Sequence, residues 1–202
     1  MKITEEARTN KKILEFTNSL SDNDIWKKMQ KPNDSWKDDQ VFQNYHSLSP
    51  GGKGKLGEYY VEEFMKILGS NVMPALNKGH DRIIDGHKTE IKFALAKKEN
   101  GAIKRNHYNI NHVGIYKDWD RIIVVLVNPN NPSPEPNMDR ARIFWQSKKD
   151  FKRYSFQNGI FVHQQGGKKS ENDDYMCAGK KNIEKWINLS SVKHICQWKD
   201  SR

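Results

Sequence analysis

The dipeptide Asp85-Gly86 separates two short β-rich segments, and it is the feature that most constrains how this chain can fold. Asp-Gly between such segments is a strong signal for a two-residue type I′ turn, because both central residues adopt positive φ. With this turn at the centre, Ile83 faces Lys88 across the strand pair. The sequence therefore predicts an antiparallel hairpin within residues 79–96.

The predicted register brings two acids together. Asp81 lies directly opposite Glu90, and Lys92 points to the same face because side chains alternate along a strand. Ile91 and Phe93 point the other way, into the core. Like charges on directly opposed residues destabilise a sheet, so this arrangement makes sense if a cation lies between the acids. A turn longer by one residue would place Asp81 and Glu90 on opposite faces.

An Asp, a Glu and a Lys converging on one face suit metal-assisted phosphodiester hydrolysis. Mg²⁺ prefers oxygen ligands and is typically held by one or two carboxylates, waters and substrate phosphate oxygens. A neighbouring lysine can orient or deprotonate a water, or neutralise charge on the phosphate. The alternative is an exposed hairpin whose charges form surface ion pairs of small energetic value. Composition alone favours that alternative, because this spacing often occurs by chance.

The charge balance favours a polyanionic partner. The 202-residue chain has 35 Lys and Arg against 25 Asp and Glu, for a net charge of +10. Nucleic acid is the first interpretation. A membrane surface is the second, although the basic amphipathic helix or polybasic terminus expected for it is not evident. The alternative is that the lysines only solvate the surface.

Other features of the sequence indicate the cellular compartment and argue against disulfide and transition-metal sites. Residues 1–12 contain no apolar segment of signal-peptide length, and the longest apolar run, RIIVVLVNP, is too short to span a bilayer, so we expect a cytoplasmic protein. Cys177 and Cys196 lack a CxxC partner, which favours two reduced thiols. The scattered histidines do not predict a transition-metal site.

The order of elements predicts an α/β domain. We expect short helices and loops over residues 10–47, a break at SLSPGGKGK, and a helix over 56–69 that ends at Gly69. DRIIVVLVNP is typical of a strand buried on both faces, and a Pro/Asn-rich loop follows it. RARIFWQ and GIFVHQ predict further strands, and GKKNIEKWINL a late helix. The expected organisation is one domain over 1–202, with an N-terminal helical part (1–48), a core (50–130) and C-terminal strands and helix (131–202).

HDRIIDGHKTEIKFA resembles the core motif of the PD-(D/E)XK nuclease superfamily, in which an Asp is followed by a hairpin and a Glu-x-Lys strand. GKLGEYYVEEFMKILG is similar to that superfamily's first core helix, and DWDRIIVVLVNP to its next central strand. His80 stands where the family often has proline. The resemblance covers about residues 50–130 and implies a restriction-endonuclease-like core with a mixed β-sheet flanked by helices.

The resemblance also implies roles for individual residues. Asp81 and Glu90 correspond to the metal-binding acids, and Lys92 to the lysine that positions or activates the attacking water. The main-chain carbonyl of Ile91 would be a further ligand of the Mg²⁺ cofactor.

Two glutamates of the preceding helix are less specific candidates. Glu58 is a candidate helper near the beginning of the helix, and Glu62 lies one turn later on the same face. The alternative for both is a solvated helix face with an acid near the positive helix end. Asp85 is interpreted as a turn residue, because Asp is favoured where φ is positive.

Two basic segments are candidates for DNA contact. The first, within residues 97–114, offers phosphate and base contacts through Lys104, Arg105, Asn106, His107 and Asn109. The second, within residues 163–174, offers Gln164, Gln165, Lys168 and Lys169 beside two glycines. A polar surface helix and a solvated hairpin loop, respectively, explain the same compositions.

Within the superfamily, the sequence favours a type II restriction endonuclease acting on double-stranded DNA as a homodimer. GGKGK and GGKKS lack the spacing of a phosphate-binding loop, so we expect no ATP-dependent motor. The flanking residues 1–50 and 130–202 could furnish base-reading loops. One alternative is a structure-selective repair or junction nuclease of the same superfamily. Another is a basic nucleic-acid-binding protein without catalysis.

Overall fold

The computed structural model describes residues 4–20, 39, 41–42, 45, 48–99, 102–103, 106–129, 140–163 and 175–199. The helices are α1 (Glu5–Ser19), α3 (Pro50–Ile67), α4 (Lys148–Asp150) and α5 (Lys180–Ile187), with a π-helical segment η3 (Phe151–Phe156) and a 3₁₀ turn η4 (Ile195–Gln197). The strands are β1 (Val72–Pro74), β2 (Arg82–Ile84), β3 (His87–Leu95), β4 (Lys98–Glu99), β5 (Ala102–Ile103), β6 (Ile110–Gly114), β7 (Arg121–Val127), β8 (Ala141–Ser147), β9 (Val162–His163), β10 (Tyr175–Ala178) and β11 (Lys193–His194).

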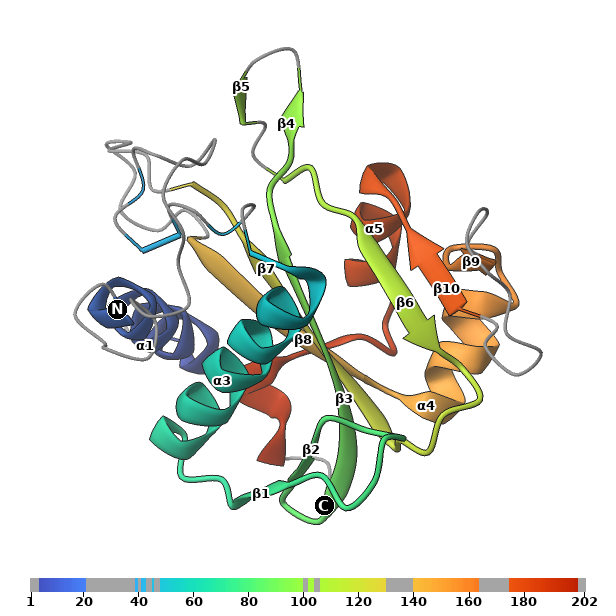
Figure 1. Cartoon of the computed structure of the whole chain (residues 1–202), viewed down its shortest axis with the longest axis horizontal. Helices are drawn as coiled ribbons and strands as arrows, with labels where there is room; N and C mark the ends of the chain where they lie inside the picture. The colour runs from blue at the N-terminus through green and yellow to red at the C-terminus, as the bar shows by residue number, and fades with distance from the viewer. Residues whose placement is uncertain are drawn as a thin grey trace.

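The described strands include a six-stranded sheet in the order β1-β2-β3-β7-β8-β11. β3 and β7 are parallel and the other neighbours are antiparallel, so the sheet is mixed. Every residue of β7 is buried, as predicted for this strand. In Figure 1 the sheet is seen close to edge-on, with α1 and α3 to the left and β6, β10, α4 and α5 to the right. The predicted α/β fold with a mixed sheet flanked by helices is confirmed.

The layer formed by α1 and α3 packs against the face of β3 that carries Phe93. Gly57 of α3 lies so close that a Cβ there would be 2.5 Å from Cβ of Phe93. The Tyr60 ring is centred 5.2 Å from the Phe93 ring, and its hydroxyl is 2.6 Å from that of Thr17 on α1. These aromatic and hydroxyl contacts fix both helices on one face of the sheet.

The start of α3 differs from the prediction. The sequence predicted a break through SLSPGGKGK, but the helix already begins at Pro50. Oγ of Ser49 accepts a hydrogen bond from the Gly52 amide at 3.1 Å, and proline is favourable in a first helical turn. Glu58 therefore lies in the middle of the helix rather than near its beginning. Gly69 has φ of +73°, which agrees with the predicted helix end.

The β2–β3 hairpin has the predicted geometry. Asp85 and Gly86 have φ of 49° and 83°, as a type I′ turn requires. The paired residues are Arg82 with Thr89, Ile83 with Lys88 and Ile84 with His87. This ladder ends at Arg82. Beyond it, the Asp81 amide donates to the Thr89 carbonyl at 3.0 Å, so Asp81 sits at the mouth of the hairpin rather than in a regular pair with Glu90.

Other expected elements differ in extent. Of residues 10–47, where short helices and loops were expected, residues 10–19 lie in the 15-residue helix α1, whose buried face contains Ile13 and Phe16. Most of residues 21–47 lie outside the described residues. The predicted strand GIFVHQ is reduced to the two residues of β9. The edge strands β1 and β11 have too few residues to produce a periodic signal.

None of the helices in the described part of the chain is long and apolar enough to cross a bilayer.

Candidate active site

Asp81, Glu90 and Lys92 meet where the hairpin opens. Nζ of Lys92 lies 2.6 Å from Oε1 of Glu90, its neighbour two residues back on the same face of β3. Oδ2 of Asp81 accepts a hydrogen bond from the Ile91 amide at 2.7 Å. The Asp81 side chain thereby bonds the backbone of β3 at the residue between Glu90 and Lys92, which fixes one acid beside the other.

Glu90 is a buried carboxylate. Its side chain is 2% exposed, against 19% for that of Lys92. Burial raises the pKa of Glu90, the Lys92 charge opposes this rise, and the Asp81 charge adds to it. The ionised form of Glu90 is thus disfavoured despite its ion pair, and an additional cation at this position would stabilise it.

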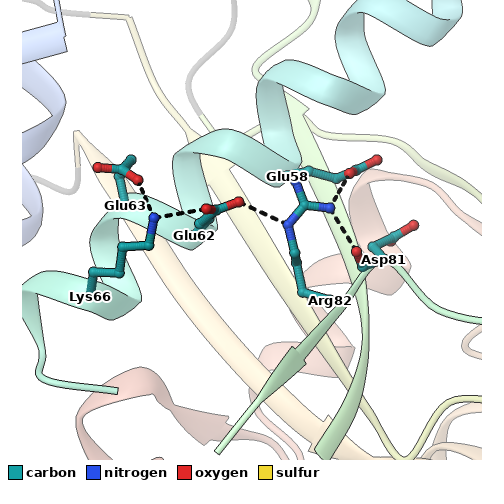
Figure 2. Close-up of polar contacts among 6 residues, drawn as sticks. All are labelled: Glu58, Glu62, Glu63, Lys66, Asp81 and Arg82. Carbon is teal, nitrogen blue, oxygen red and sulfur yellow. Dashed lines mark hydrogen bonds and ion pairs between the residues drawn. The ribbon is translucent and has the colours of Figure 1, made fainter. Parts of the chain in front are cut away.

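The opposite face of the hairpin carries a second charged network, shown in Figure 2. Arg82 donates from Nη1 to Glu58 at 2.6 Å and from Nε to Glu62 at 2.9 Å, so it holds two acids of α3. The same Nη1 donates to the main-chain oxygen of Asp81 at 2.7 Å. Lys66 continues the network, with Nζ 2.8 Å from carboxylate oxygens of both Glu62 and Glu63. Arg82 therefore ties α3 to the residue that supplies the first acid of the site.

The two glutamates held by Arg82 differ electrostatically. Burial raises the pKa of Glu58, the Asp81 charge raises it further, and Arg82 opposes both. Burial also acts to raise the pKa of Glu62, but hydrogen bonds from Lys66 and Arg82 outweigh it, and the pKa falls. The charge of Asp81 thus acts on the pKa of Glu58, whereas the pKa of Glu62 is governed by its ion pairs with Lys66 and Arg82.

The donor set at the hairpin mouth is compatible with a hard cation. Asp81 and Glu90 supply carboxylate oxygens, and the backbone of Ile91 runs between them. Among the residues that the structure describes, no three His, Cys, Asp or Glu side chains form a ready-made metal cluster. Two carboxylates are enough for Mg²⁺, which keeps several waters and takes further oxygens from substrate phosphates. The residues present therefore fit this ion.

The predicted DNA-contacting residues are only partly described. Lys104, Arg105, Gln164, Gln165, Lys168 and Lys169 lie outside the described residues. The carbonyl of His107 accepts the Lys97 amide at 2.7 Å, which places His107 beyond the far end of β3. At about 3.3 Å per residue, that end lies roughly 16 Å from Glu90.

The side chain of Asn106 is engaged within the protein. Its Oδ1 accepts hydrogen bonds from Asn128 at 3.1 Å and from Arg142 at 3.0 Å, which leaves its amide as the group that a base could reach. Asn109 is exposed, but its side-chain amide also has partners within the protein, since its nitrogen donates to the main-chain oxygen of Tyr108 and its oxygen accepts from Nζ of Lys97. The DNA-contacting role of this segment stays a prediction.

Three cations near the acids had no predicted role. The predicted register pairs Arg82 with Thr89, and it already directs Arg82 toward the face opposite Asp81. Lys117 and Lys148 act electrostatically on Glu90 from distant parts of the chain. No local pattern could have associated them with the hairpin, because the pairing of β3, β7 and β8 brings them there.

No protein-family model and no curated protein matches this chain. One solved structure, of the bacterial homing endonuclease I-Ssp6803I, is similar at 14% sequence identity, with a TM-score of 0.36. The match covers 76% of this chain and 97% of that one.

Proposed function

We propose that this protein is a Mg²⁺-dependent endonuclease of the PD-(D/E)XK superfamily that cuts double-stranded DNA, and that it acts as a type II restriction enzyme. The observation that carries the proposal is the hydrogen bond from the Ile91 amide to Asp81, which holds that carboxylate beside the Glu90–Lys92 pair. The net charge of +10 supports a polyanionic substrate. The homodimer and the independence from ATP remain parts of the proposal.

The proposed chemistry assigns each residue a task. Asp81, Glu90 and the Ile91 carbonyl would hold Mg²⁺, which supplies Lewis acidity toward the phosphate oxygens and lowers the pKa of a bound water. Lys92 orients the attacking water and neutralises charge that develops on the phosphate. Burial of Glu90 excludes bulk water on one side, which strengthens the electrostatic interactions of the site. Glu58 assists through its proximity to Asp81.

The test is digestion of unmodified plasmid and phage DNA by purified protein, with Mg²⁺ and with EDTA. The same digestion uses Lys92→Ala and, as a control, Lys66→Ala, whose lysine lies in the network on the other side of the hairpin. We expect discrete, metal-dependent fragments from the native protein and from Lys66→Ala, and none from Lys92→Ala. Cleavage of branched DNA alone would replace restriction by a structure-selective activity. DNA binding without cleavage of any substrate would remove the nuclease proposal.

A further inference from the structure

Three lysines from two distant segments gather at the end of the sheet next to the acids. Lys117 follows β6, Lys148 begins α4, and Lys152 lies in η3. Nζ of Lys148 donates to the main-chain oxygen of Lys117, and it lies 5.1 Å from the centre of the Trp119 ring. The Lys148 side chain thus has a fixed position, which is uncommon for a lysine at the protein surface.

The strand register places Lys148 on the same side of the sheet as Glu90. Glu90 pairs with Ile122 of β7, and Ile122 pairs with Gln146 of β8, so these three residues share one face. Lys148 is two residues beyond Gln146 and follows the same alternation. A hydrogen bond of 2.7 Å from the Lys148 amide to the Asp120 carbonyl extends the β7–β8 pairing to this residue. Figure 1 shows α4 at the end of β8, on the side of the sheet away from α3.

Acids and lysines lie together at this end of the sheet. Lys117 and Lys148 both attract Glu90, Asp118 and Asp120 also attract Lys148, and Lys152 repels it. Nζ of Lys88 lies 2.7 Å from Asp118, whereas Asp120 accepts a hydrogen bond from the uncharged main-chain amide of Lys88 at 2.9 Å.

Burial also disfavours the charged form of Lys148. Burial lowers the pKa of Lys148, and the charge of Lys152 lowers it further. Lys148 is half-buried and Lys152 is exposed, so an anion can approach the pair from solvent. Both lysines would gain from a negatively charged ligand that lies between them.

We propose that Lys117, Lys148 and Lys152 form a phosphate-binding site that holds the backbone of the cut strand next to the scissile position. The inference rests on the proposed nuclease function. A phosphodiester backbone offers a regularly repeated negative charge, and lysine binds phosphate as a compact point charge. The strand would run from Asp81 and Glu90 along α4 and η3. None of these three lysines is among the residues that the sequence predicted for DNA contact.

The test measures the salt dependence of DNA binding for Lys148→Met, Lys152→Met and the double variant. Fluorescence anisotropy with labelled duplex DNA, Ca²⁺ in place of Mg²⁺ and about 50 to 200 mM salt gives the slope of log K against log salt. Each lost phosphate contact should reduce the slope by about 0.9, so the double variant should lose roughly 2. Lys11→Met is the control, because Lys11 lies on α1, in the layer on the other face of the sheet.

The outcomes separate this inference from the nuclease proposal. Slopes equal to that of the native protein, in variants with native thermal unfolding, would overturn the phosphate site even if cleavage is intact. Reduced slopes without cleavage of any DNA would support the phosphate-binding site and contradict the proposed nuclease function. If Lys148→Met does not fold, the exposed Lys152→Met decides the question alone, with an expected reduction of about 0.9. Lys148→Arg keeps the charge and should retain the native slope.

Discussion

The two faces of the β2–β3 hairpin carry charges in contrasting arrangements. On the face toward α3, Arg82 lies 2.6 Å from Glu58 and 2.9 Å from Glu62, and its side chain is 21% exposed. On the other face, Glu90 is 2% exposed, and its ion pair with Lys92 does not compensate its burial. The first arrangement joins elements together, whereas the second leaves a carboxylate that a further cation would stabilise. Within one hairpin, Arg82 thus has a structural role, whereas Glu90 has a proposed catalytic role.

The largest expected effect is on cleavage, from Asp81→Asn. An asparagine keeps an oxygen that can accept the Ile91 hydrogen bond, so the fold should be retained while the charge is lost. Loss of one preorganised charged group costs on the order of 10²–10³-fold in rate, and we expect a decrease of at least this size. Single-turnover cleavage with Mg²⁺ measures it, and DNA binding with Ca²⁺ should remain within a few-fold. Native cleavage rates in this variant would contradict the assignment of Asp81.

The next largest effect is on stability, from Arg82→Met. This change leaves Glu58 and Glu62, which are both 26% exposed, without their shared cation. Because partly buried charged hydrogen bonds are lost together, we expect a decrease of about 2–3 kcal/mol in the free energy of unfolding. Urea denaturation measures it. A loss below about 0.5 kcal/mol would show that this network does not join α3 to the hairpin.

A smaller effect of opposite sign is expected from Glu90→Gln in the absence of divalent metal. Because the folded state raises the pKa of Glu90 above its ordinary value of 4.5, the native protein loses stability as pH rises through that value toward the folded-state pKa. The variant lacks this loss, so it should be more stable than the native protein at neutral pH, and the difference should vanish in acid. Thermal unfolding across this pH range tests the sign. A less stable variant at neutral pH would mean that the Lys92 pair outweighs burial.

The smallest effect is expected from Lys66→Met. Lys66 pairs with Glu62 and Glu63, but its side chain is 47% exposed. Exposed ion pairs on a helix contribute about 0.3–0.5 kcal/mol each, so the total change should remain below about 1 kcal/mol. Urea denaturation beside Arg82→Met provides the comparison. A loss of stability as large as that of Arg82→Met would show that Lys66 and Arg82 contribute equally to the network, and it would contradict the expected difference between them.

Much of the hairpin could be predicted from the sequence, because its information is local. Asp85 and Gly86 determine the turn, the turn determines the register, and alternation separates Arg82 from Asp81. The predicted direct pairing of Asp81 with Glu90 is absent from the β2–β3 ladder. The ladder ends one residue earlier, since the Asp81 carboxylate takes the Ile91 amide as its partner.

The surroundings of the hairpin could not be predicted in the same way. The extension of α3 back to Pro50 depends on the Ser49 cap, which compensates for a glycine-rich first turn. Lys117 and Lys148 reach the site because β7 pairs with β3 on one side and β8 on the other. Such long-range pairings produce no local pattern in the sequence.

The contrast between the two faces is tested most directly by one pair of glutamates. Single-turnover cleavage of supercoiled plasmid with Mg²⁺ is measured for Glu90→Gln and Glu62→Gln, after both are shown to be folded. We expect Glu90→Gln to lose cleavage by about 10²-fold or more, and Glu62→Gln to stay within a few-fold of the native rate. Native cleavage by Glu90→Gln, or an equal loss in both variants, would contradict this expectation.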